Sequence, residues 1–179
     1  EIRPCDWSSD VCSSDLADGP ETAAGWLTAV TGSKPVCLVL TRQNLQKQEK
    51  SGLDALKGGY ILSDSKQKKP QLLLMGSGSE VEPLMEAQKT LRADGIDARV
   101  ISMPSMELFE ETPAAYKEAV MPLSVRARIA MEAACSQPWY RYTGLDGATV
   151  CIDHYGASAP AGILFREFGL TAEHVVDVA

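Results

Sequence analysis

Four polar side chains follow a short apolar run near the start of the chain and could bind an anionic substrate. Residues 36–40 are too few for a helix and predict a parallel strand buried on both faces. Directly after them come Thr41, Arg42, Gln43 and Asn44, and ligands of open α/β sheets collect beyond the carboxyl ends of such strands. The planar guanidinium of Arg42 suits a phosphate, and the neighbouring amides suit hydroxyl or carbonyl groups. An ordinary exposed strand end would show the same pattern.

The elements that must position this cluster fall into two groups. Residues 21–30 predict a helix that joins strand 36–40 in a partial α/β unit, which cannot bury its own apolar faces. From residue 71 onward strands and helices alternate, which predicts a three-layer α/β domain with a mainly parallel sheet. Its expected strands are 72–75, 98–102, 128–132 and 149–153, and its expected helices are 79–94, 112–121, 159–168 and 171–178. The polar segment between the two groups should contain one short strand, at 59–62.

A Gly-rich turn at residues 76–79 precedes the first helix of this domain. Ser79 and Glu82 have capping-box spacing, and Pro83 is close enough to the helix start to be tolerated. A dinucleotide fingerprint would need a third glycine and an acidic residue at the end of the next strand, where Ser102 stands. We therefore expect a structural turn, with anion binding at the helix start as the alternative.

Composition narrows the class of protein. The chain has 45% hydrophobic and 23% charged residues and a net charge of −7. This acidity argues against a nucleic-acid-binding protein, which would show a basic face. Cys37, Cys135 and Cys151 lie in or beside apolar segments and are expected to be reduced core thiols. The two histidines have no cysteine or histidine at the spacing of metal ligands, so we expect no metal site in this chain. No apolar run reaches the ~20 residues that a membrane-spanning helix needs.

Residues 1–16 differ from the rest of the chain. They repeat Ser-Ser-Asp, show no apolar periodicity, and resemble the translation of a sequencing adaptor, so we exclude them from the expected fold. A natural but divergent start is the alternative. Without these residues the net charge is −4, because they contain four acidic side chains and one arginine.

Five motifs in order carry a resemblance to a known family. They are the Thr-Arg-Gln-Asn cluster, residues 58–62 (Gly-Gly-Tyr-Ile-Leu), 76–81 (Gly-Ser-Gly-Ser-Glu-Val), 100–105 (Val-Ile-Ser-Met-Pro-Ser) and 153–169, which begin Asp-His-Tyr-Gly-Ala-Ser-Ala-Pro. Together they closely resemble the carboxyl-terminal part of transketolase, over residues 17–179. Residues 17–26 resemble the family segment that begins Arg-Pro-Ala-Asp, cut just before its Ala.

The resemblance implies a division of the chain and a role for one residue. It implies an adaptor-like leader (1–16), the end of the pyrimidine-binding domain (17–47), an interdomain linker (48–70) and the transketolase C-terminal domain (71–179). Arg42 matches the arginine that binds the substrate phosphate, whereas the roles of Gln43 and Asn44 do not follow. Thr41 stands where the family commonly has Ser.

The activity implied for the parent is transfer of a two-carbon ketol unit between ketose and aldose phosphates of the pentose phosphate pathway. The parent would be a cytoplasmic homodimer that uses thiamine diphosphate and a divalent metal such as Mg²⁺. The family's metal motif, its activating glutamate and its catalytic histidines belong upstream of Ala17, so no catalytic, cofactor or metal residue is assigned here. We expect the chain alone to be inactive.

Several alternatives stay open. The chain could be a free-standing dimerisation or binding module, or a relative such as dihydroxyacetone synthase, deoxyxylulose-phosphate synthase or a 2-oxoacid dehydrogenase β subunit. The Arg-Gln-Asn cluster favours transketolase or dihydroxyacetone synthase over deoxyxylulose-phosphate synthase and a 2-oxoacid dehydrogenase β subunit. A packing or surface role is expected for His154. An apolar strand ends in Glu132, and beyond it Trp139, Tyr140 and Tyr142 fit either a dimer contact or core packing.

Overall fold

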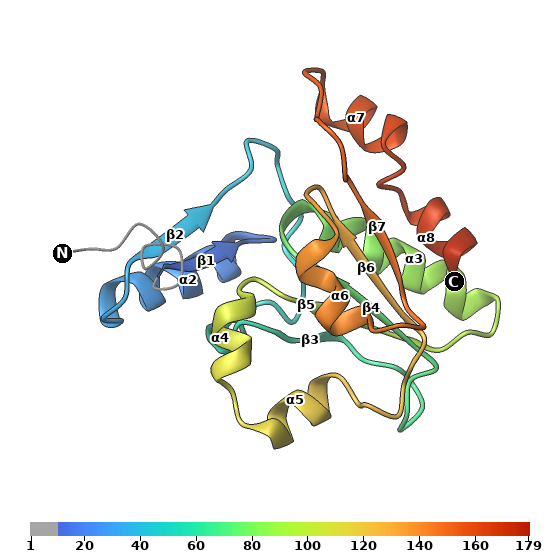
Figure 1. Cartoon of the computed structure of the whole chain (residues 1–179), viewed down its shortest axis with the longest axis horizontal. Helices are drawn as coiled ribbons and strands as arrows, with labels where there is room; N and C mark the ends of the chain where they lie inside the picture. Colours follow the sequence, from blue (N-terminus) through green and yellow to red (C-terminus); the bar gives the residue numbers. More distant parts are fainter. Residues whose placement is uncertain (1–10) are drawn as a thin grey trace.

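The computed structural model describes residues 11–179, and its centre is a five-stranded sheet (Figure 1). The strand order is β3-β5-β4-β6-β7, and all neighbours are parallel except β3, which pairs antiparallel with β5 at one edge. The strands are β3 (Tyr60–Ser63), β4 (Leu72–Gly76), β5 (Ala98–Ser102), β6 (Arg128–Glu132) and β7 (Ala148–Cys151). The predicted mainly parallel sheet is confirmed.

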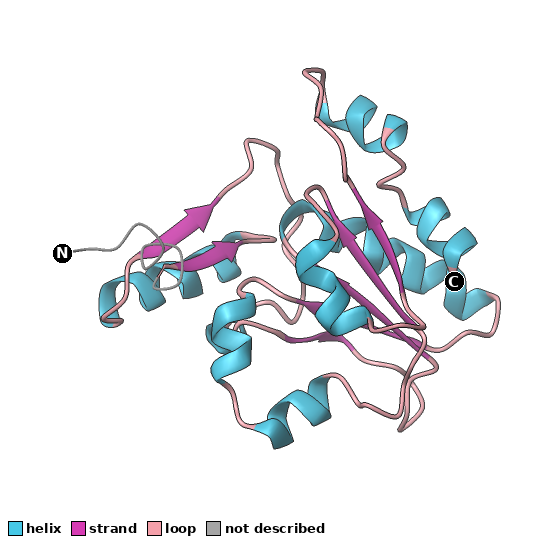
Figure 2. Cartoon of the chain, in the orientation of Figure 1, coloured by secondary structure: helices cyan, strands magenta, loops and turns pink. Residues whose placement is uncertain are grey.

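Helices cover both faces of this sheet, as Figure 2 shows. One face packs under α3 (Val81–Ala93) and α8 (Ala172–Val178). The other packs under α4 (Met106–Glu111), α5 (Ala114–Val120) and α6 (Tyr140–Thr143). Leu72 and Leu74 belong to the first core and Leu73 and Met75 to the second, so β4 is buried on both faces. The expected three-layer α/β arrangement is confirmed.

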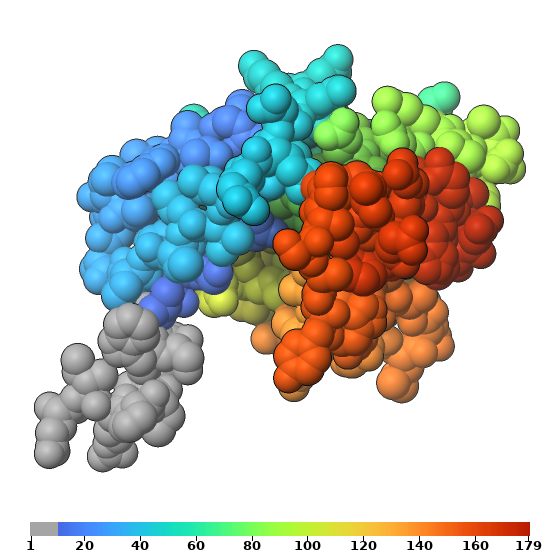
Figure 3. Space-filling model, turned by 90° about the horizontal axis from the view of Figure 1, so that it is seen from above, coloured from blue at the N-terminus to red at the C-terminus, as the bar shows by residue number. Residues whose placement is uncertain are grey.

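A smaller unit lies beside this domain. It contains β1 (Cys12–Asp15), α2 (Gly19–Thr31) and β2 (Val36–Val39), and β1 and β2 form a parallel pair. Asp18 caps α2 by accepting a hydrogen bond from the N–H of Glu21, and Pro20 occupies the first turn. In the space-filling view the unit, in blue, lies on the opposite side of the molecule from the red carboxyl-terminal residues (Figure 3).

The structure corrects four expectations about side-chain environment. Strand β2 is parallel but not buried on both faces: Val39 is exposed, because α2 is the one described helix that packs extensively on β2. Cys37 lies on that open face and is exposed rather than in the core. Cys135 is exposed as well, since it lies in the turn after β6, and Cys151 at the end of an edge strand is only partly buried.

The predicted capping box is wrong. A 3-10 turn, η2 (Gly78–Glu80), precedes α3, so the helix begins at Val81 and no side chain caps it. The Ser79 hydroxyl donates to the carboxylate of its neighbour Glu80 instead. Pro83 lies in the first turn of α3, where its missing N–H leaves no helical hydrogen bond unmade.

Some elements were not expected. Residues 12–15 form strand β1, although residues 1–16 had been excluded from the fold; residues 1–10 lie outside the described part. Short helices α4, α6, η1 (Leu53–Lys57) and η3 (Gln137–Trp139) were also missed. Among the described residues, no helix is both long and apolar enough to cross a bilayer.

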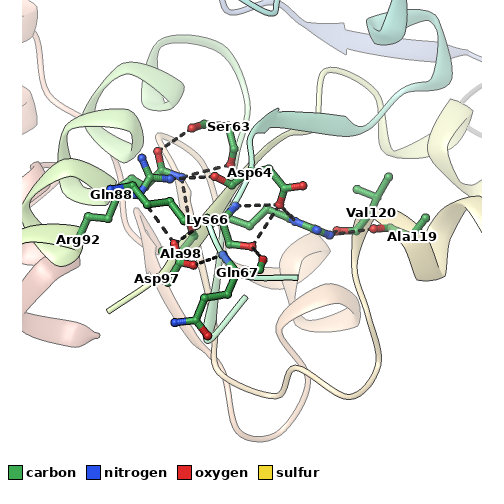
Figure 4. Close-up of polar contacts among 12 residues, drawn as sticks. Ser63, Asp64, Lys66, Gln67, Gln88, Arg92, Asp97, Ala98, Ala119 and Val120 are labelled. Carbon is green, nitrogen blue, oxygen red and sulfur yellow. Dashed lines mark hydrogen bonds and ion pairs between the residues drawn. The ribbon is translucent and has the colours of Figure 1, made fainter. Parts of the chain in front are cut away.

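A polar network fixes the turn between β3 and β4 against the sheet (Figure 4). The Asp97 carboxylate accepts the backbone N–H groups of Lys66 and Gln67 at 2.9 and 2.7 Å. Arg99, a buried side chain of β5, donates to Asp64 at 2.7 Å and to two carbonyl oxygens at the end of α5. These bonds satisfy a cation that would otherwise be costly to bury.

Candidate functional site

The predicted anion-binding cluster lies just beyond the end of β2. The Thr41 hydroxyl accepts a 3.1 Å hydrogen bond from the N–H of Gln43, which turns the chain out of the strand. Thr41, Gln43 and Asn44 line a cavity of about 330 Å³. Its other wall is formed by Asp18, the N-cap of α2, and by Gly19 and Thr22 in the first turns of that helix.

Arg42 is placed differently from its neighbours. Its side chain is exposed and is not among the residues that line this cavity. Within the described part of the chain its guanidinium makes no hydrogen bond or ion pair. An unpaired guanidinium beside amide and hydroxyl groups can bind a phosphate, but nothing around it forms a nucleophile and base pair. Among the described residues, this end of β2 thus has donors for an anion and no paired nucleophile and base.

Glu21, which the sequence did not single out, joins the small unit to the large sheet. Its carboxylate is fully buried and accepts hydrogen bonds from the hydroxyls of Tyr60 on β3 and Ser102 on β5, at 2.8 and 2.6 Å. The N–H of Ala17 donates a third, at 2.8 Å. Burial raises the pKa of Glu21, although these hydrogen bonds oppose the shift.

A second acidic group gathers at the carboxyl ends of β1, β4 and β6. Carboxylate oxygens of Asp15, Glu80 and Glu132 all lie within 4.8 Å of one another. The Ser77 hydroxyl is 2.6 Å from Glu132 and 3.1 Å from Asp15. No lysine or arginine lines either of the two cavities that border this cluster in the described structure.

Burial raises the pKa values of these three carboxyl groups. Burial, followed by repulsion from Glu132 and Asp15, raises the pKa of Glu80 to about 8. Burial likewise raises the pKa of Glu132 to about 7, and that of Asp15 above its ordinary value. Within the described residues these three are the one group close enough to share an ion, but acidity alone does not indicate a metal and we assign none.

The same surroundings bear on the Gly-rich turn at residues 76–79. Gly78 has a positive φ of 52°, and a Cβ built on it would lie 2.5 Å from the Asp15 carboxylate. Three carboxyl groups crowd the turn, so an anion would be repelled there. The structure thus favours the expected structural turn over anion binding.

The remaining candidates are structural. Trp139 and Tyr142 are core residues, whereas Tyr140 is exposed. His154 is exposed, its Nδ1 lies 2.8 Å from the carbonyl oxygen of Tyr155, and its ring contacts Phe168 edge-on. These contacts agree with the packing or surface role expected for it.

Sequence reasoning missed Glu21 and the acidic cluster for a common reason. Asp18 and Glu21 have the spacing of a capping box, which could have located the start of α2. Nothing local indicates that Glu21 meets Ser102, which lies 81 residues away. The cluster likewise brings together residues from three distant strand ends.

Comparison with known proteins gives a consistent result. Residues 58–171 match the family model described as transketolase-like TK C-terminal domain. The chain is 46% identical over 166 residues to transketolase 1 of Vibrio parahaemolyticus and 45% identical over 166 residues to transketolase of Bacillus subtilis; each match covers 90% of this chain and 25% of the relative. A solved transketolase from Leishmania mexicana superposes with a TM-score of 0.87 at 36% identity, over 94% of this chain and 24% of that one. The chain therefore spans about a quarter of the length of these relatives.

Proposed function

The chain belongs to the transketolase family, by its match to the C-terminal domain, and on that premise we propose that it works as the carboxyl-terminal part of a ketol-transferring enzyme. The parent would move a two-carbon unit between ketose and aldose phosphates. The observation that carries the proposal is the match over residues 58–171 together with relatives that are transketolases over 90% of this chain.

The division of the chain is part of the proposal. Residues 17–47 would be the end of the pyrimidine-binding domain, 48–70 a linker, and 71–179 the C-terminal domain. Strand β3, inside that linker, adds to the large sheet, so the linker would be anchored at its second half. Residues 1–16 would be the adaptor-like leader.

Exposed apolar side chains support a missing neighbour for the small unit. Trp26 is 57% exposed, Val30 is 71% exposed and Leu40 is 55% exposed. Such a surface is costly in water and is typical of a face that another part of a protein covers. We propose that the rest of the pyrimidine-binding domain covers it in the parent.

The chain alone would be inactive. The parent would use thiamine diphosphate and a divalent metal, but the described residues do not fit a diphosphate. The cavities beyond the ends of β1, β2 and β6 contain Asp15, Asp18 and Glu132 and no lysine or arginine. The cofactor ligands would belong to the rest of the parent, which by the family resemblance is a cytoplasmic homodimer.

Arg42 is the residue proposed to bind the substrate phosphate. Its guanidinium is exposed and has no partner among residues 11–179, so its donors are available to a ligand. A relative such as dihydroxyacetone synthase is the second candidate for the parent, because the Thr-Arg-Gln-Asn cluster fits it too.

A chimera tests the proposal. Residues 17–179 would replace the corresponding part of the Bacillus subtilis transketolase, which is 45% identical. We expect ketol transfer from ketose phosphate to aldose phosphate in the purified chimera and none from the 179-residue chain alone. A folded chimera without ketol transfer would contradict the proposed function, and activity of the chain alone would overturn the proposed inactivity.

A further inference from the structure

A cavity of about 340 Å³ lies between α5 and α6, on the face of the sheet that α4 also covers. The buried side chains of Phe109 and Met121 and the exposed side chain of Leu123 give it an apolar lining. Arg128, the first residue of β6, lines it too, so this α5–α6 cavity lies at the opposite end of the strand from Glu132. Its volume is at the low end of the range for small-molecule sites, so a ligand that fills it is small.

The guanidinium of Arg128 is fixed beside the α5–α6 cavity. It donates to three main-chain carbonyl oxygens, from Nε to Val125 at 2.8 Å, from Nη1 to Tyr142 at 2.7 Å and from Nη2 to Pro122 at 2.9 Å. A guanidinium has five N–H donors, so two remain, one on each terminal nitrogen. Two such donors can pair with both oxygens of a carboxylate.

The positive charge of Arg128 has no ion-pair partner among residues 11–179. Glu118 is the acid whose charge acts on it, but the oxygens of Glu118 accept the N–H of Leu123, at 3.2 and 3.3 Å. Burial lowers the pKa of Arg128, although Glu118 opposes the shift, because a cation taken partly out of water needs an opposite charge. A bound anion would supply that charge.

Two further cations line the α5–α6 cavity and share one acid. Glu110 of α4 pairs with Lys117 at 2.6 Å and with Arg141 at 2.8 Å. With Arg128 and Glu118 the lining contains three cations and two acids, which leaves one positive charge in excess although the whole chain carries −7. A monoanion balances this excess, whereas a doubly charged phosphate would leave an excess of negative charge.

The walls of the α5–α6 cavity are held by hydrogen bonds before any ligand binds. The buried side chain of Arg99 donates to the carbonyl oxygens of residues 119 and 120 at the end of α5 (Figure 4). Arg128 holds the turn that follows, through Pro122 and Val125. A site that is already formed loses less conformational entropy when a ligand binds.

We propose that the α5–α6 cavity binds a small organic monocarboxylate, whose carboxylate pairs with Arg128 and Arg141 and whose apolar part packs against Met121 and Leu123. The carboxylate offsets the unpaired charge of Arg128. The apolar part covers Leu123, which is 77% exposed in the structure. This binding goes beyond the proposed ketol transfer and does not depend on it.

Isothermal titration calorimetry of the full 179-residue chain with phenylacetate, at constant ionic strength and near neutral pH, tests the site. We expect saturable binding with a Kd of about 1 mM or lower. Phenylacetamide has the same apolar part without the charge and should bind at least about tenfold more weakly. Acetate, which lacks the apolar part, should also bind at least about tenfold more weakly.

Four variants make the test specific, and circular dichroism checks that each is folded. Arg141→Ala, Leu123→Asp and Arg128→Lys should each weaken phenylacetate binding by about tenfold or more, because they remove a donor, add a repelling charge or remove the planar fork. The side chains of Arg141 and Leu123 are exposed, so the fold tolerates these two changes. Arg126→Ala is the matched control, because Arg126 is an exposed cation that does not line the cavity, and its Kd should equal that of the original chain.

Three results would contradict the proposal. No saturable binding by the folded chain up to about 10 mM phenylacetate would overturn the site. Equal weakening by Arg141→Ala and Arg126→Ala would overturn it as well, because it would show a general attraction to exposed cations. Tighter binding of phenyl phosphate than of phenylacetate would overturn the assignment to a monoanion.

Discussion

The hydroxyl of Ser102 donates a 2.6 Å hydrogen bond to the carboxylate of Glu21, which comes from a helix 81 residues earlier in the chain. Ser102 ends β5, a strand in the interior of the large sheet, and Glu21 lies in the first turn of α2. Both side chains are fully buried. This contact and its neighbour from Tyr60 make the small unit part of the same folded body as the sheet.

Ser102→Ala should lower the free energy of unfolding by about 1–3 kcal/mol, because a buried carboxylate loses one of its three donors. Urea unfolding followed by circular dichroism measures the change. Ser124→Ala, at an exposed position, is the matched control and should change stability by less than about 0.5 kcal/mol. Equal effects of the two substitutions would show that the Glu21 contact contributes little.

Glu21→Gln should alter the pH dependence of stability. The pKa of Glu21 is raised in the folded state, so its contribution is complete below about pH 4.5, its ordinary value, and declines as the pH rises through the raised value. The amide cannot ionise, so the stability difference between Glu21→Gln and the original chain should shift in favour of the variant from pH 5 to 8. A difference that is constant over this range would contradict the raised pKa.

Arg42→Ala, made in the active chimera, should raise KM for a phosphorylated substrate by about 10- to 100-fold, the usual effect of losing a charge-assisted pair. The KM for the same sugar without its phosphate should not change. Lys47→Ala, which removes another exposed cation close by, serves as the control and should leave both sets of values unaltered. An equal increase in KM for both substrates would show that Arg42 does not bind the phosphate.

Arg99→Met should destabilise the large domain by about 2–4 kcal/mol, since it leaves carbonyl oxygens of residues 119 and 120 without their donor and Asp64 without its ion pair. Arg126→Met breaks an ion pair in which both side chains are half or more exposed and should cost less than about 1 kcal/mol. Thermal unfolding of the two variants gives the comparison, and a smaller effect at residue 99 would contradict the role of the network.

The strands and the longer helices were predictable because their apolar patterns are strong. Residues 72–75 and 98–102 are apolar enough to be recognised as buried strands, and α3 shows its buried face as Val81, Leu84, Gln88 and Leu91. The large sheet and its layers follow from that alternation.

What could not be predicted depends on contacts between distant segments. Val39 and Cys37 have the sequence of a buried strand, but the layers that would cover them are not in the described structure. β1 has poor strand propensity, and its pairing with β2 comes from main-chain hydrogen bonds that the side chains do not reveal. The acidic cluster and the Glu21 contact join elements whose proximity only the folded chain shows.

The long passage from β7 to α8 has an entropic consequence. Between Ile152 and Gly169 no side chain is fully buried, and α7 (Ala161–Glu167) has no buried residue, whereas Leu170 and Val175 are buried against α3 and the sheet. Helix α8 therefore binds the sheet much as a ligand joined to it by a linker would. The fraction of time that α8 stays packed depends on its effective concentration near the sheet, which the length of the connecting segment sets. Each doubling of that length raises the free energy of closing the loop by only about 0.6 kcal/mol. Insertions in the exposed stretch 153–160 should therefore cost the protein little, because the packing of α8 depends on Leu170 and Val175, with Phe165, Phe168, Ala172 and Val176 beside them.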